Sequence, residues 1–145
     1  MTITVAERSR LLMPGMANFE PGVERYRVTG GAVTAVLMGA GDRLEIIDPE
    51  GCQPVEVAAF DRDGKSDPGL LGHSSGAPAT GIAAILAGNQ HDASRVADAL
   101  ALRGIDLGAT TAIHCFSQDS APAETIWMTA SADVVALPKN LASLL

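Results

Sequence analysis

Short apolar segments, bounded by Gly, Pro and Asp turns, are the feature that most constrains how this chain can fold. Their lengths and their content of Val, Ile and Leu are typical of β-strands. The run at 32–38 is nearly continuous in apolar residues, which predicts a strand buried on both faces. Pro138 is expected to end the last strand. The predicted strands cover residues 23–28, 32–38, 42–48, 54–60, 110–116, 123–129 and 133–137.

The turns between these strands have recognisable sequences. The Gly-Ala-Gly segment at 39–41 leads into a strand, not a helix, so it is interpreted as a hairpin turn and not as a nucleotide-binding loop. The Asp-Pro-Glu-Gly segment at 48–51 fits a type I turn. Turn chemistry accounts for Asp48 and Asp61 without a catalytic role.

The middle of the chain has a different character. Residues 79–86 are small, apolar and interrupted by glycine, which favours at most a short helix. A clearer helix is predicted at 93–103, with Asp92 as its N-cap and Gly104 as its C-terminal stop. Strands, then helix, then strands predict a mainly β (α+β) fold, an antiparallel β-barrel or sandwich with a one- or two-helix insertion.

The length of 145 residues allows a single domain with a sizeable core. We expect a lead-in segment at 1–22, one β-rich domain at 23–138, and a C-terminal tail or start of a linker at 139–145. Hydrophobic residues make up 47% of the chain and aromatic residues 3%, so the core must be aliphatic.

The chain is acidic, with a net charge of −7, and its sequence contains no basic stripe or arginine cluster. This pattern excludes a nucleic-acid partner. The longest uncharged run, residues 68–90, is interrupted by glycine, proline, serine and histidine, so no membrane-spanning helix is expected. Three of the first ten residues, Glu7, Arg8 and Arg10, are charged, whereas a signal peptide would be apolar there. We therefore expect a cytoplasmic protein.

Four residues are weak candidates for metal ligands: Cys52, His91, His114 and Cys115. His114 and Cys115 are adjacent on a predicted strand, so their side chains should point to opposite faces of the sheet. No spacing typical of a metal site supports the group, and buried structural cysteines are the favoured alternative. The residues by themselves identify no catalytic group.

Residues 41–57 contain Asp48, Glu50, Gly51 and Gln53 in the pattern Asp-x-Glu-Gly-x-Gln. This pattern resembles the hallmark of the urea-carboxylase-associated protein family. The resemblance implies two antiparallel strands joined by a tight turn, with Gln53 as a ligand or interface candidate at the start of the second strand. Catalytic members carry a Gly-x-His-Asp segment followed by metal-binding cysteines. Here the corresponding segment, 88–92, is one residue longer, so only His91 can be carried over.

A wider resemblance extends over nearly the whole chain. Residues 14–17, 48–51, 78–81 and 103–108 are similar to the amino-terminal region of trimethylamine-N-oxide demethylases. This resemblance implies an aldolase-type lyase that releases dimethylamine and formaldehyde. It also implies a cysteine-bound zinc site, and tetrahydrofolate capture of formaldehyde by an aminomethyltransferase-like domain, both outside these 145 residues.

The resemblance therefore predicts a non-catalytic subunit or domain that packs on a larger, metal-dependent catalytic protein in a hetero-oligomer. Zinc and tetrahydrofolate are expected in that partner, and no cofactor is expected in this chain. Two alternatives stay open. One is a stand-alone zinc-dependent hydrolase or lyase acting on a C–N bond, with ligands from Cys52, His91, His114 or Cys115. The other is a small-ligand binding barrel with Gln53 as a polar anchor.

Overall fold

The computed structural model describes residues 2–6, 22–73, 77–78, 98, 100–102, 104–105 and 110–141. Its strands are β1 (Thr2–Ala6), β2 (Val23–Arg27), β3 (Val36–Met38), β4 (Arg43–Asp48), β5 (Val55–Phe60), β6 (Ala77–Pro78), β7 (Thr111–Cys115), β8 (Glu124–Thr129) and β9 (Val134–Asn140). A 3₁₀ helix, η1 (Pro68–Leu71), follows β5.

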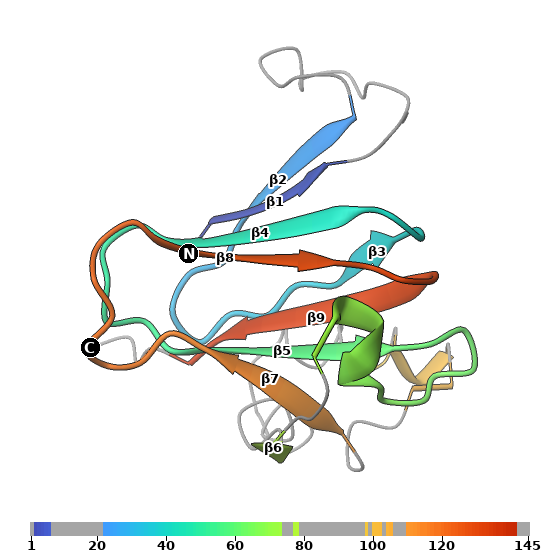
Figure 1. Ribbon diagram of the computed structural model, residues 1–145. Coiled ribbons are helices and arrows are strands. Elements are labelled where there is room, and N and C mark those ends of the chain that lie inside the picture. Colours follow the sequence, from blue (N-terminus) through green and yellow to red (C-terminus); the bar gives the residue numbers. More distant parts are fainter. Residues whose placement is uncertain are drawn as a thin grey trace.

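The strands form two antiparallel sheets packed face to face as a β-sandwich (Figure 1). Sheet A has the order β2-β1-β4-β8, and sheet B has the order β3-β9-β5-β7-β6. The predicted mainly β, antiparallel fold is confirmed. The expected lead-in at 1–22 is wrong in one respect, because Thr2–Ala6 forms β1 inside sheet A, between β2 and β4.

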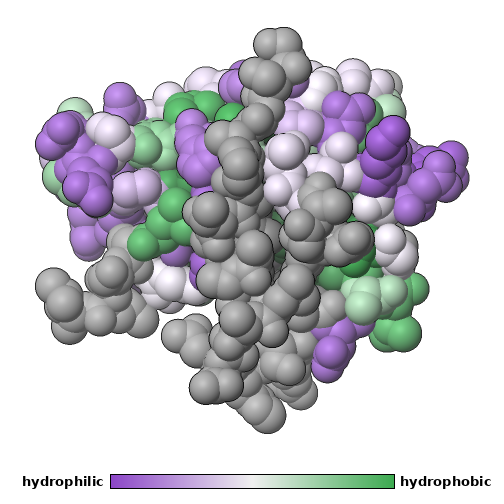
Figure 2. Space-filling view, turned by 90° about the horizontal axis from the view of Figure 1, so that it is seen from below, coloured by the Kyte–Doolittle hydropathy of each residue, from purple (hydrophilic) through white to green (hydrophobic). Residues whose placement is uncertain are grey.

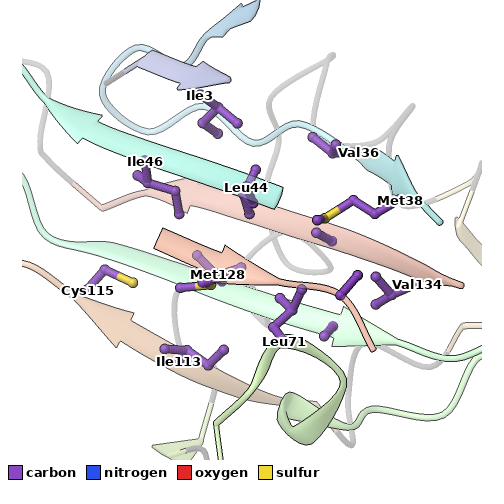
Figure 3. Packing of buried hydrophobic residues seen from close by; sticks show 14 of the residues in the cluster. Ile3, Val36, Met38, Leu44, Ile46, Leu71, Ile113, Cys115, Met128 and Val134 are labelled. Atoms are coloured by element: carbon purple, nitrogen blue, oxygen red, sulfur yellow. The ribbon is translucent and has the colours of Figure 1, made fainter. Parts of the chain in front are cut away.

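The core between the sheets follows from the alternation along each strand. In β4, Leu44 and Ile46 are fully buried while Arg43 is exposed, because successive side chains point to opposite faces. Aliphatic side chains from both sheets meet in one cluster, which Leu71 of η1 also joins (Figure 3). The aliphatic core expected from the composition is therefore present.

The central strand of sheet B, β5, is buried on both faces, since all six of its residues are buried. A second cluster lies on its outer face, where Leu100 and Ile105 pack against Phe60 and its neighbours. The Gly104 and Ile105 amides donate to the carbonyls of Ala101 and Leu100, at 3.0 and 3.1 Å, and Gly104 has a φ of 77°. This is the Schellman arrangement that glycine favours, so the predicted helix stop is confirmed.

Other parts of the predicted helical region, including residues 79–86 and Asp92, lie outside the described residues. Within the described part of the chain, no helix is long and apolar enough to cross a membrane.

Two strands differ from their predictions. β3 covers only Val36–Met38, and Leu37 is exposed, so the run at 32–38 is not a strand buried on both faces. β9 continues through Pro138 to Asn140, two residues into the predicted tail. The Pro138 carbonyl accepts a hydrogen bond from the Thr34 amide, so the ring nitrogen faces the same side, away from β5. Proline therefore removes no hydrogen bond between β9 and β5.

Both predicted hairpin turns are in fact links between the two sheets. Residues 39–42 connect β3 of sheet B to β4 of sheet A, and residues 49–54 connect β4 to β5 of sheet B. The backbone of the first link is hydrogen-bonded to Ala130, in the link that follows β8. The backbone of the second link is hydrogen-bonded to Ser120, in the link that precedes β8. At each end of β4, two links between the sheets are thus hydrogen-bonded to each other. The local sequence of such a link is the same as that of a hairpin turn, so the sequence cannot tell the two apart.

Asp48 organises the second of these ends. Its carboxylate is fully buried and accepts hydrogen bonds from the Gly51 amide at 2.9 Å, the Gln53 amide at 3.1 Å and the Ser120 hydroxyl at 2.9 Å. Gly51 has a φ of 79°, and a Cβ there would lie 2.6 Å from the Ser120 carbonyl oxygen. Turn chemistry does explain Asp48, but the turn joins two sheets.

We expect Asp48→Ala to destabilise the fold by about 3 kcal/mol, because it leaves two buried amides and a hydroxyl without their charged acceptor. Urea unfolding monitored by circular dichroism measures this. Asp63→Ala removes an exposed carboxylate from another turn and should change stability by less than about 0.5 kcal/mol. Equal effects of the two substitutions would contradict the role given to Asp48.

Candidate functional site

Gln53 forms part of the hydrogen-bond network at this end of the sandwich. Its side-chain amide donates to the Glu50 carboxylate at 3.3 Å, and its side-chain oxygen accepts from the Asn140 amide at 3.0 Å. Asn140 is fully buried and also donates to the Val28 carbonyl at 3.1 Å. Gln53 therefore ties the β4–β5 link to the end of β9.

Cys52 lies on the same link and is exposed. Its amide donates to the Ser120 hydroxyl at 2.9 Å, and its Sγ lies 3.7 Å from the Ser120 carbonyl oxygen. Its φ of 58° falls in the left-handed region, which a tightly bonded link can impose on a non-glycine residue. The thiol is accessible, in contrast to that of Cys115.

His114 and Cys115 point to opposite faces of sheet B, as the strand alternation predicts. Cys115 is buried in the core between the sheets, and His114 is on the outer face of β7. Burial raises the pKa of the Cys115 thiol to about 12, because desolvation disfavours the thiolate. Cys115 thus remains a neutral thiol at physiological pH.

The metal-ligand candidates do not form a group in the described part of the chain. Cys52 is on a link, His114 is on the outer face and Cys115 is inside the core, while His91 lies outside the described residues. Among the residues that the structure describes, no three His, Cys, Asp or Glu side chains are placed to hold a metal ion. Cys52, His114 and Cys115 therefore do not form a metal site with one another.

A polar cluster does form on the outer face of sheet B, from Glu56, His114 and Lys139, which we call the Glu56 cluster. Glu56 on the central strand β5 is paired with His114 on β7 and with Lys139 on β9. Paired residues in antiparallel strands project to the same face. The sheet thus places a carboxylate between an imidazole and an ammonium group.

The three members of the Glu56 cluster differ in burial. Glu56 is fully buried, whereas the His114 side chain is 44% exposed, with its Nε2 at 3.9 Å from the Glu56 Oε1. The Lys139 ammonium donates to the Gly31 carbonyl at 2.9 Å. Desolvation lowers the pKa of Lys139, and the Glu56 charge partly opposes that shift.

This arrangement lets a buried negative charge be balanced from two neighbouring strands. His114 is the accessible member, since its side chain is partly exposed to solvent while it lies near the carboxylate. Sequence reasoning named His114 but missed Glu56 and Lys139. The available signal was Glu56 itself, a charged residue inside the apolar run at 54–60.

A pocket of about 510 Å³ lies at the opposite end of β5 from Gln53. Its wall is mainly apolar, from residues such as Met38, Phe60 and Ile105, and Asp61, Arg62 and Asp133 add charged groups. Gln53 is not among its described lining residues, so the expected polar anchor is not part of this pocket.

Comparison with known proteins places the chain in a larger context. No family model matches it, and no solved structure is significantly similar to it. The trimethylamine-oxide aldolase of Ruegeria pomeroyi is 32% identical over 137 residues, which cover 92% of this chain. This chain is homologous to part of that lyase. It spans only 17% of the length of the aldolase. The resemblance to the urea-carboxylase-associated family stays a prediction.

The burial of Cys115 predicts that only one of the two cysteines reacts in the folded protein. We expect a thiol-specific disulfide reagent at pH 8 to label Cys52 and to spare Cys115, which lacks thiolate character. Mass spectrometry of the labelled peptides identifies the site, and both thiols should react in urea. Rapid labelling of native Cys115 would contradict its place in the core.

Removing the charge of Glu56 should leave the partly desolvated ammonium group of Lys139 without the negative charge that stabilises it. We expect Glu56→Gln to destabilise the fold by about 2 kcal/mol at pH 7, less than for a fully buried pair because Lys139 is only partly buried. The pKa of Lys139 should fall further. Since the unfolded state then binds more protons, the variant should regain stability as the pH rises toward 10.

Urea unfolding at pH 7 and pH 9.5 measures both effects. Adding Lys139→Met to Glu56→Gln should recover part of the loss, because it removes the uncompensated ammonium group. Glu124→Gln, at an exposed position, is the matched control and should have little effect. A double variant no more stable than Glu56→Gln alone would argue against this coupling.

Proposed function

We propose that this chain is a non-catalytic β-sandwich subunit or domain of a trimethylamine-oxide-cleaving lyase and that it packs on a larger catalytic partner. The observation that carries the proposal is the coverage of the match. Nearly all of this chain corresponds to one short segment of a trimethylamine-oxide aldolase, and most of the aldolase has no counterpart here. In this proposal, the catalytic groups lie in the part of the lyase that this segment does not cover.

The fold supports the idea that the homologous segment is a structural unit. The described strands pair in two sheets around an aliphatic core formed by this chain's own side chains. Such a unit can be joined to a catalytic protein through its surface without sharing a core.

In the proposed assembly, trimethylamine N-oxide is cleaved to dimethylamine and formaldehyde by the partner. Zinc belongs to that partner in this proposal, because Cys52, His114 and Cys115 do not converge in this chain. Tetrahydrofolate is assigned to the same partner, as the resemblance implies. This chain contributes shape and contacts at the edge of the reaction chamber.

The test compares the 145-residue chain alone with the assembly purified from its own source. We expect the chain alone, supplied with zinc, to release no formaldehyde from trimethylamine N-oxide above the rate without protein. Native mass spectrometry of the gently purified protein should show a complex with a much larger polypeptide. The full-length Ruegeria pomeroyi aldolase is the positive control.

Formaldehyde release by the isolated chain, together with about one zinc ion per chain, would overturn the accessory role. It would favour the stand-alone zinc-dependent enzyme instead and make His91, His114 and both cysteines the first residues to replace.

A further inference from the structure

The two outer faces of the sandwich differ in what covers them. On sheet B, Leu100 and Ile105 cover part of the outer face. Viewed from below, hydrophilic residues lie at the left and the upper right of the molecule, and hydrophobic residues lie at the lower right (Figure 2). On sheet A, the outward residues of β2, β4 and β8 include exposed arginines and an exposed tryptophan.

The pairing register shows how these residues share one face. Ile3, Leu44 and Met128 are buried in the core, so the alternate positions of sheet A point outward. One row across the sheet runs from Arg25 through Thr4 and Glu45 to Trp127. We call the outward residues Arg25, Arg27, Arg43 and Trp127 the arginine–tryptophan face.

Trp127 is the most prominent member of this face. Its side chain is 52% exposed, although it is large and hydrophobic, and the Arg43 guanidinium lies 4.4 Å from the centre of its ring. This cation–π contact holds both side chains in a defined position before any partner binds. Tryptophan and arginine are the side chains that most often dominate binding energy at protein interfaces.

The charge of this face is opposite to that of the molecule. Three arginines and one glutamate, Glu45, point outward here, whereas the whole chain carries a net charge of −7. Residues 25–27 and Arg43 are separated in sequence, and sheet A places them on one outward face, on the strands β2 and β4 at either side of β1.

We propose that the arginine–tryptophan face is the surface through which this chain docks on an acidic surface of the larger lyase partner. The inference rests on the proposed function. The charge selects an acidic surface, and it disfavours contact with the same face of a second copy, where arginines would meet arginines. The exposed Trp127 supplies an apolar anchor that becomes desolvated at the centre of the contact.

The experiment uses the assembly as it exists in the source of the protein. The full chain carries an affinity tag, and the co-purified partner is identified by peptide mass spectrometry as a protein related to trimethylamine-oxide aldolase. The test variant is Arg27→Glu with Arg43→Glu. The matched control is Arg62→Glu with Lys65→Glu, which changes the net charge equally at exposed positions in the turn after β5.

We expect the test variant to recover about tenfold less partner per chain than wild type, since like charges then face each other. The control variant should recover the wild-type amount, and raising the salt concentration should weaken the wild-type complex. Circular dichroism melting checks that each variant is folded. Arg27→Glu alone, which leaves the Arg43–Trp127 contact in place, replaces the double variant if that variant melts early.

The other outcomes overturn the docking surface in distinguishable ways. If the test variant retains the partner, this face is not the contact, while the proposed function stands. If both variants lose the partner equally, net charge and not this face decides binding. If wild type recovers no such lyase, the proposed function fails as well. If wild type forms dimers that the test variant lacks, the occupant is a second copy of the chain.

Discussion

The buried carboxylate of Asp48 is the interaction on which one end of this sandwich depends. It stands where the chain leaves sheet A, and it bonds the backbone of the link to sheet B and the hydroxyl of Ser120 on a second link. A charged acceptor with three donors offsets the cost of its own burial. Hydrogen bonds that continue from this carboxylate also hold Cys52, through Ser120, and Asn140, through Gln53.

Burial of β5 on both faces of sheet B creates a second core, and it also buries a charged side chain, that of Glu56. Ala58 and Phe60 of β5 can pack beneath Leu100 and Ile105, but Glu56 on the same outer face cannot be left alone. The neighbouring strands supply His114 and Lys139. The cluster is therefore a consequence of register, because a slip of β5 by one residue would turn Glu56 to the core and away from His114 and Lys139.

The open face of sheet A fits a chain that corresponds to a small part of a larger lyase. Leu100 and Ile105 cover part of the outer face of sheet B, whereas Trp127 and the arginines of sheet A are exposed. In the proposed assembly, the exposed face of sheet A is the surface that meets the larger catalytic partner.

The sequence by itself determined the strands other than β1 and β6, the aliphatic core, the Asp48 turn and the Gly104 helix stop, because each depends on local alternation or local backbone conformation. Likewise it determined that His114 and Cys115 face opposite ways. Only the tertiary structure decided that the turns at 39–41 and 48–51 join two sheets, and that Pro138 is tolerated within β9. It alone brought Glu56 to Lys139, and Arg43 to Trp127. Such pairs depend on strand order and register, which link residues far apart in the chain and leave no local pattern.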